Sequence, residues 1–172
     1  DKALLLGDAA HAIVPFYGQG MNCGFEDCTV LGDCIERLGR KGRAAPDWGR
    51  IFSDFTRLRK PNADAISEMA VENFIEMRDK VADPRFLLEK QVEKELEARF
   101  PQAYVPRYSL VTFSRLPYAL AQRAGAVESR ILAELCRGIE SPEQVDYGLA
   151  RELIERELSP VLGSRPGSAV RR

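Results

Sequence analysis

The chain has 172 residues, and its 25 lysines and arginines against 26 aspartates and glutamates leave a formal net charge of −1. This balance gives no electrostatic reason to expect nucleic acid or an anionic membrane as a partner. No apolar run reaches the roughly eighteen residues of a transmembrane helix, and the four cysteines lack the CxxC spacing of a zinc site. The length allows one domain with a sizeable core.

The opening of the chain carries the strongest local pattern. Residues 3–6 are four consecutive apolar residues followed by Gly7, which predicts a short strand buried on both faces, as in a parallel sheet. Gly7 then forms a turn, and Asp8 falls at the carboxyl end of the strand, where open α/β sheets bind their ligands. A carboxylate at that point can accept hydrogen bonds from sugar hydroxyls.

A loop rich in proline and glycine, residues 15–20, leads into a predicted helix over residues 20–38. The apolar residues of this helix recur at helical spacing: Met21, Phe25, Cys28, Leu31, Ile35 and Leu38. Its free N–H groups and positive dipole end could hold a phosphate or an electron-rich ring edge. The residues alone leave two interpretations equally open: half of a nucleotide-cofactor site, or an acidic turn followed by a plain glycine loop.

Further helices are predicted after this loop. Asp47 is a suitable cap for a helix that Pro61 should end or kink, and another helix runs to about residue 80. Asn73 stands on the apolar stripe of that second helix, so its amide must find a hydrogen-bond partner. A backbone carbonyl is the commoner partner for such an amide, and a bound ligand is the alternative.

The last part of the chain again shows start and stop signals. Asp83 followed by Pro84 predicts a helix that reaches about residue 100. Polar and apolar residues alternate around Tyr108 through residue 113, which favours a short extended segment. A helix should follow from residue 117 to a stop at Gly138, and Ser141 should cap the final helix, which ends near residue 160. Residues 161–172 form a polar tail that we expect to be disordered.

Three separated stretches resemble one protein family. GDAAH (7–11) followed by PFYGQGMNCGFEDC (15–28) resembles the second flavin-binding motif of the FAD-dependent aromatic hydroxylases. RLRKPNADAISEMAVENFIEMRDKV (57–81) and VPRYSLVTFSRLPY (105–118) are similar to later parts of the same family, in the same order. The sequence of the loop is most similar to that of the family members that hydroxylate L-kynurenine.

The resemblance implies a Rossmann-type α/β flavoprotein hydroxylase fold, of which this chain is the C-terminal part. The part in hand is then mostly α-helical, with one core strand and one short extended segment. Residues 1–60 correspond to the end of the FAD-binding domain, 61–160 to a helical region on the substrate side, and 161–172 to the tail. The GxGxxG turn of such a fold does not occur here, so we expect it in a missing upstream half.

The activity implied by the resemblance is hydroxylation of L-kynurenine to 3-hydroxykynurenine with NADPH and O2. This reaction is a step of the kynurenine pathway, which degrades tryptophan and leads to quinolinate and NAD synthesis. A flavin hydroperoxide carries the chemistry, so no residue of the chain is assigned a catalytic role and the fragment alone is expected to be inactive. Residues implied to contact FAD are Gly7, Asp8, Gly18, Gly20, Met21 and Asn22. Those implied to contact the substrate are Asn73, Tyr108, Pro15, Phe16 and Gln19, with Asn73 and Tyr108 at its amino-acid end.

Other features fit the same interpretation. His11, next to the expected cofactor loop, is predicted to be a positioning or hydrogen-bonded histidine, because flavin chemistry needs no histidine base. No metal site is predicted. The absence of an apolar C-terminal anchor leads us to expect a soluble, cytoplasmic, bacterial enzyme. Two alternatives remain: a related FAD hydroxylase acting on another aromatic acid, and a non-catalytic helical module that binds a partner.

Overall fold

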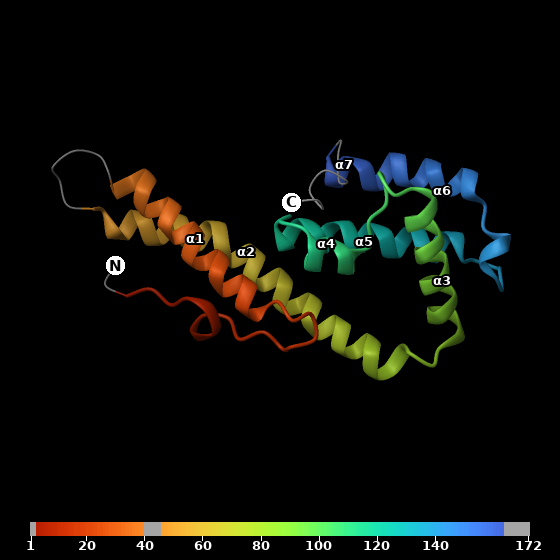
Figure 1. The fold of residues 1–172 in the computed structure, drawn as a ribbon, viewed down its shortest axis with the longest axis horizontal. Helices are drawn as coiled ribbons and strands as arrows, with labels where there is room; N and C mark the ends of the chain where they lie inside the picture. Colours follow the sequence, from red (N-terminus) through yellow and green to blue (C-terminus); the bar gives the residue numbers. More distant parts are fainter. Residues whose placement is uncertain (1–2, 40–45, 164–172) are drawn as a thin grey trace. The chain divides into compact units, whose positions relative to one another are not determined.

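The computed structural model describes residues 3–39 and 46–163. The chain forms two compact units, Asp1–Glu72 and Asn73–Arg172, and each unit is described by itself. The described residues are mostly helical, and none of them lies in a β-strand. Figure 1 shows the helices in chain order, with the start of the chain in red.

The first unit is built around two helices, α1 (Gly20–Gly39) and α2 (Trp48–Ile75), which follow a short 3-10 turn, η1 (Gly7–Ala9). Cys34 of α1 packs with Ile51 and Phe55 of α2 in a buried cluster. Leu4 and Leu6 of the opening segment pack against this cluster, so the red segment in Figure 1 runs beside the helices. The unit is therefore a helix pair with an extended segment on its side.

The predicted strand at residues 3–6 is wrong. The backbone is extended at Leu6, but no described residue belongs to a strand with which this segment could pair. Leu5 is 64% exposed, whereas Leu4 and Leu6 contact the helix pair. Only alternate side chains are covered, so the segment is also not buried on both faces.

Helix α1 confirms the predicted helix over residues 20–38, but its buried side differs from the predicted stripe. Met21, Phe25 and Cys28 are exposed, and Cys23, Asp27 and Cys34 are buried instead. Leu31, Ile35 and Leu38 are half-buried, as part of the cluster with α2. The first turns of α1 thus bury a carboxylate, and they expose the sulfur and apolar groups that the sequence pattern predicted to be buried.

Helix α2 passes through Pro61 without ending, which corrects the prediction of two helices. Pro61 itself is exposed, while buried residues continue on both sides of it along one face of the helix, among them Phe55, Ala63 and Ile66. Continuous packing of that face compensates for the single hydrogen bond that a proline cannot donate. Asp47 caps the helix as predicted, because its Oδ1 accepts the Arg50 N–H at 3.0 Å.

The second unit contains the remaining elements. They are the short π-helix η2 (Glu76–Lys80), α3 (Pro84–Arg99), α4 (Arg107–Phe113), α5 (Tyr118–Leu135), the 3-10 turn η3 (Pro142–Gln144), α6 (Tyr147–Leu153), the short π-helix η4 (Ile154–Leu158) and α7 (Ser159–Leu162). Its core contains large, fully buried side chains from several of these helices, including Leu96, Leu110, Ile131 and Leu153. Helix α5 packs against α3, α4, α6 and α7.

Local signals in this unit are confirmed. Asp83 caps α3 by accepting the Arg85 N–H at 2.8 Å, with Pro84 in the first turn. Ser141 forms the predicted capping box with Gln144, although the element that it opens is the 3-10 turn η3. Gly138 adopts a positive φ of 73° after α5, which is the conformation that suits glycine at a helix end.

The predicted extended segment around Tyr108 is wrong, because residues 107–113 form helix α4. The first N–H of this helix, that of Arg107, donates to the buried carboxyl oxygen Oε2 of Glu128 at 2.8 Å. Leu110 and Val111 are buried by the same packing. A carboxyl group supplied by α5 therefore stabilises a helix whose own sequence alternates like a strand.

No helix in the described residues is long and apolar enough to cross a membrane. The chain continues in α7 to Leu162, so the first residues of the predicted tail are helical. The rest of that tail, residues 164–172, and most of the predicted loop before Asp47 lie outside the described residues.

Candidate functional site

The turn that carries Asp8 is folded tightly against α1. Gly7 adopts a positive φ of 55°, which favours glycine, and its carbonyl accepts the N–H groups of Ala10 and His11. A Cβ atom built on Gly24 of α1 would lie only 3.7 Å from the Cα of Gly7. The turn and the helix therefore lie next to each other at these two glycines.

Asp8 lies next to the beginning of α1. Its carboxylate is exposed, and its Oδ1 would be 4.0 Å from a Cβ atom on Gly20, the first residue of the helix. The N–H groups at this helix end are the ones that have no partner within a helix. An acidic group and a set of backbone donors thus meet at one place, and either can bind a polar ligand.

The predicted loop before α1 is ordered by its own contacts. Gly18 has a positive φ of 65°, and the Gln19 carbonyl accepts the Cys23 N–H at 2.8 Å, which closes the first helical turn. The buried Gln19 side chain also accepts the Asn22 Nδ2 at 2.9 Å. Tyr17, in the same loop, is buried.

The remaining predicted residues of this region differ in exposure. Pro15 and Asn22 are exposed, Phe16 is half-buried, and Met21 is 71% exposed at the start of α1. The structure therefore brings Gly7, Asp8 and Gly20 together. It leaves Met21 and Asn22 accessible at the same helix end.

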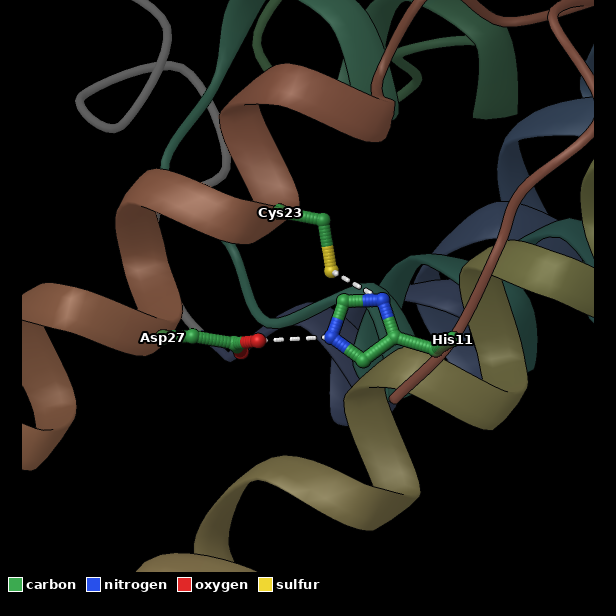
Figure 2. Close-up of side chains that lie close together, drawn as sticks. All are labelled: His11, Cys23 and Asp27. Atoms are coloured by element: carbon green, nitrogen blue, oxygen red, sulfur yellow. Dashed lines mark hydrogen bonds and ion pairs between the residues drawn. The ribbon is translucent and has the colours of Figure 1, made fainter. Parts of the chain in front are cut away.

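Beneath this surface, the imidazole of His11 lies between Cys23 and Asp27, as Figure 2 shows. His11 Nε2 is 2.6 Å from Asp27 Oδ2, and His11 Nδ1 is 3.9 Å from Cys23 Sγ. His11 is therefore a hydrogen-bonded histidine, as predicted. Asp27 Oδ2 also accepts the Gly7 N–H at 2.9 Å, so one carboxylate oxygen connects α1 with η1, the turn that contains Asp8.

Arg59 of α2 completes this cluster from the other side. Its Nε donates to Asp27 Oδ1 at 2.7 Å, and its Nη1 donates to Glu26 at 2.9 Å. Its Nη2 donates to the carbonyl and the sulfur of Cys23. Burial alone raises the pKa of Asp27, but hydrogen bonds from Gly7, Arg59 and His11 outweigh that effect and lower the pKa below its ordinary value.

Cys23, His11 and Asp27 resemble both a metal-ligand set and a nucleophile with its base, because one ligand atom of each lies within 4.8 Å of the others. The surroundings disfavour both roles. The guanidinium of Arg59 already supplies a positive charge to Asp27 and Cys23, where a cation would have to sit. Burial raises the pKa of the Cys23 thiol to about 11, so it stays protonated and weakly nucleophilic.

The predicted amino-acid contacts, Asn73 and Tyr108, both lie in the second unit. Asn73 is half-buried in the last turn of α2, just before the short π-helix η2. Short π-helical segments are frequent at functional sites. Tyr108 is in the first turn of α4, 51% exposed, with its ring edge-on to Phe113. An ion pair between Arg107 of α4 and Glu76 of η2, 3.6 Å apart, links α4 to the segment that directly follows α2.

Behind α4 lies a buried carboxyl group. Glu128 of α5 is 2% exposed, and its Oε2 accepts the Arg107 N–H. Its other oxygen and the hydroxyl of Tyr104 are buried without a hydrogen-bond partner in the described part of the chain. Burial raises the pKa of Glu128 to about 8, even though the Arg107 N–H acts in the opposite direction.

Sequence reasoning missed Asp27, Arg59 and Glu128. Arg59 stands four residues after Phe55 and four before Ala63 on the buried face of α2, and a charged residue in such a register signals a buried partner. Asp27 stands four residues after Cys23 in the same way. Glu128 stands in the same register on α5, four residues after Ala124 and four before Leu132, but its partner is a backbone N–H that a sequence pattern does not identify.

Comparison with known proteins connects this geometry with flavin enzymes. A family model described as an FAD binding domain matches residues 1–48, which include the Asp8 turn and α1. Kynurenine 3-monooxygenase of Myxococcus xanthus is 56% identical over 161 residues, which is 94% of this chain and 33% of that protein.

Two further relatives carry the same name. Kynurenine 3-monooxygenase of Xanthomonas oryzae pv. oryzae is 43% identical over 95% of this chain and 34% of its own length. That of Cytophaga hutchinsonii is 50% identical over 77% of this chain and 28% of its own length. The chain spans about a third of the curated relatives that it matches. By these matches, the chain corresponds to part of proteins named kynurenine 3-monooxygenase, and its first 48 residues match an FAD binding domain.

Proposed function

We propose that the chain supplies part of an FAD-dependent enzyme that hydroxylates L-kynurenine to 3-hydroxykynurenine with NADPH and O2. The observation that carries this proposal is the identity of 43–56% to proteins named kynurenine 3-monooxygenase over almost the whole chain. The rest of such an enzyme, including a GxGxxG turn, would belong to further polypeptide. A cytoplasmic location is part of the proposal, supported by four free cysteines.

In this proposal, the first unit holds FAD through the Asp8 turn and the start of α1. The Asp8 carboxylate accepts hydrogen bonds from ribityl or ribose hydroxyls of FAD, and Gly7 and Gly20 leave room for the ligand to approach. Gly18 provides the backbone conformation that the loop requires. The exposed carboxylate beside free helical N–H groups fits the polar groups of the cofactor.

The start of α1 then faces the flavin ring. Met21 and Asn22 contact the isoalloxazine, and the N-terminal dipole of α1 favours negative charge on the reduced ring. FAD, when bound, takes electrons from NADPH and activates O2 for transfer to the aromatic ring of the substrate. Pro15, Phe16 and Gln19 line the flavin side of the substrate site, where they orient the ring and exclude water.

The second unit binds the amino-acid end of the substrate. The amide of Asn73 and the phenol of Tyr108 act as hydrogen-bond partners of the substrate carboxylate. The ion pair between Glu76 and Arg107 supports this assignment, because it joins α4, which carries Tyr108, to the residue three positions after Asn73. The partly exposed phenol of Tyr108 is also accessible to a ligand.

The test uses the complete gene product that contains this chain. We expect a yellow protein whose NADPH oxidation rises when L-kynurenine is added, with 3-hydroxykynurenine as the product. 4-Hydroxybenzoate, which lacks the amino-acid group, should not stimulate NADPH oxidation. Stimulation by 4-hydroxybenzoate alone would favour the related-hydroxylase alternative, and a colourless protein would favour the non-catalytic module.

A second test addresses the amino-acid end. Replacing both polar groups, Asn73→Ala with Tyr108→Phe, should raise the KM for L-kynurenine about tenfold or more, because hydrogen bonds to a charged group are lost. The same double change should leave FAD content as in wild type. An unchanged KM would remove Asn73 and Tyr108 from the substrate site without affecting the flavin assignment.

A further inference from the structure

Asp27 is the point at which three segments of the first unit meet. Its Oδ2 accepts the Gly7 N–H at 2.9 Å and His11 Nε2 at 2.6 Å, and its Oδ1 accepts Arg59 Nε at 2.7 Å. One carboxylate on α1 thus holds three segments: the turn η1 that contains Asp8, the loop that carries His11, and helix α2. Asp27 is 1% exposed and Arg59 is 6% exposed, so water does not replace these contacts.

The proton positions in this cluster are consistent with one another. Because the carboxylate of Asp27 is ionised, the Nε2 atom of His11 carries the hydrogen that it donates. The Nδ1 atom of His11 faces the Cys23 thiol at 3.9 Å. That thiol keeps its hydrogen, and its sulfur accepts from Arg59 Nη2 at 3.3 Å.

Such a cluster is sensitive to the loss of one member. A buried charge that loses its partner keeps the cost of desolvation without compensation. The segment nearest to the missing contact is then free to move, and for Asp27 that segment is the Gly7–Ala9 turn. Asp8 directly follows Gly7, whose N–H is held by Asp27. Movement of this turn displaces the Asp8 carboxylate from the start of α1.

We propose that Asp27, held by Arg59 and His11, is a positioning residue of the flavin site: it fixes the turn that presents Asp8 to FAD without touching FAD itself. This inference depends on the proposed FAD-binding function. It assigns to Asp27 and Arg59 a role in cofactor affinity, in addition to their role in holding α1 and α2 together.

The test compares Asp27→Asn with wild type and with Asp54→Asn in the complete gene product. Asp54 of α2 is a matched control, because it also accepts from arginines, Arg37 of α1 and Arg57 of α2, but in more exposed ion pairs that do not reach the turn. FAD affinity is measured by titration of the apoprotein at a temperature where circular dichroism shows all three proteins folded. We expect about tenfold or more weaker binding for Asp27→Asn and wild-type binding for Asp54→Asn.

A second series separates positioning from general stability. Arg59→Lys keeps a charge beside Asp27 and Arg59→Met removes it, so FAD affinity should fall in the order wild type, Lys, Met. The visible circular dichroism of bound FAD should change in Arg59→Met, because this signal reports the surroundings of the ring rather than the amount of folded protein. If Asp27→Asn does not fold, His11→Ala removes one contact of the same carboxylate and should weaken FAD binding several-fold.

Each outcome decides one question. Failure of the wild-type protein to bind FAD would refute the proposed function itself. Binding of FAD by wild type together with unchanged affinity in Asp27→Asn, or in His11→Ala where the first variant does not fold, would overturn the positioning role alone. Equal affinities of Arg59→Lys and Arg59→Met with unchanged flavin dichroism would overturn it as well.

Discussion

Glu128 should make the stability of the second unit depend on pH in an unusual direction. Its carboxyl is buried in α5, one oxygen accepts the Arg107 N–H, and its pKa is raised from 4.5 to about 8 by burial. Charges that face it also affect this pKa: Glu93 raises it, while Arg107 and Lys90 lower it. We therefore expect the folded protein to hold this proton at neutral pH.

The sign follows from where the proton is bound. Below pH 4.5 the group is protonated in both states and contributes no pH dependence. Between pH 4.5 and about 8 the unfolded chain releases the proton while the folded chain retains it, so stability falls as pH rises. At about 1.4 kcal/mol per pH unit, the loss over this range is at most about 5 kcal/mol. Above pH 8 the contribution no longer changes.

The perturbation is Glu128→Gln, which cannot ionise and keeps an oxygen that can accept the Arg107 N–H. Urea unfolding followed by far-ultraviolet circular dichroism at pH 5, 6, 7 and 8 gives the free energy of unfolding. The variant should be close to wild type at pH 5 and more stable by several kcal/mol at pH 8. Glu134→Gln, an exposed change on the same helix, should leave the pH dependence of wild type.

A constant difference between Glu128→Gln and wild type from pH 5 to pH 8 would refute this reasoning. It would mean that Glu128 ionises in the folded protein as it does in the unfolded chain. A variant that is less stable at every pH would show instead that the ionised carboxylate, and not the neutral group, is the acceptor that stabilises α4.

Three other predictions concern packing, thiol exposure and acid stability. Gly125→Ala should destabilise the protein by about 1–3 kcal/mol in urea unfolding, because its methyl group would overlap the Arg107 side chain, with Cγ only 2.8 Å away. Gly32→Ala in α1 has no atom within 4 Å and should stabilise by about 0.5–1 kcal/mol, so equal effects would contradict the packing argument. A thiol reagent followed by peptide mass mapping should label the exposed Cys28 quickly and the buried Cys23 only after unfolding; fast labelling of Cys23 would contradict its burial. The lowered pKa of Asp27 stabilises the folded protein above pH 3.8, and this stability is lost as pH falls through the pKa of Asp27 in the folded state. Asp27→Asn should therefore reduce the fall in the free energy of unfolding at acid pH. An unchanged fall would argue against the buried ion pair.

Features encoded by neighbouring residues could be predicted from the sequence. The span of α1, the Asp83 cap of α3 and the Ser141 capping box depend on residues within one or two turns of each other, and the structure confirms them. The turn at Gly7 belongs to the same class, because it depends on one backbone position.

Features that depend on distant partners could not be predicted. Helix α4 is stabilised by Glu128, twenty-one residues after Arg107, which accepts its first N–H. The Asp27 cluster depends on Arg59, thirty-two residues further along the chain. The strand prediction failed because an apolar run does not specify its neighbour, and here that neighbour is a helix pair. The assignments of Asn73 and Tyr108 to the substrate stay predictions.

The central claim is that the Asp8 turn and the start of α1 hold FAD. It is tested most directly by FAD titration of the complete gene product carrying Asp8→Ala, with Asp33→Ala, an exposed acidic position on α1, as the control. We expect Asp8→Ala to bind FAD about tenfold or more weakly, and Asp33→Ala to bind it as wild type does. Equal affinity of all three proteins for FAD would contradict the claim.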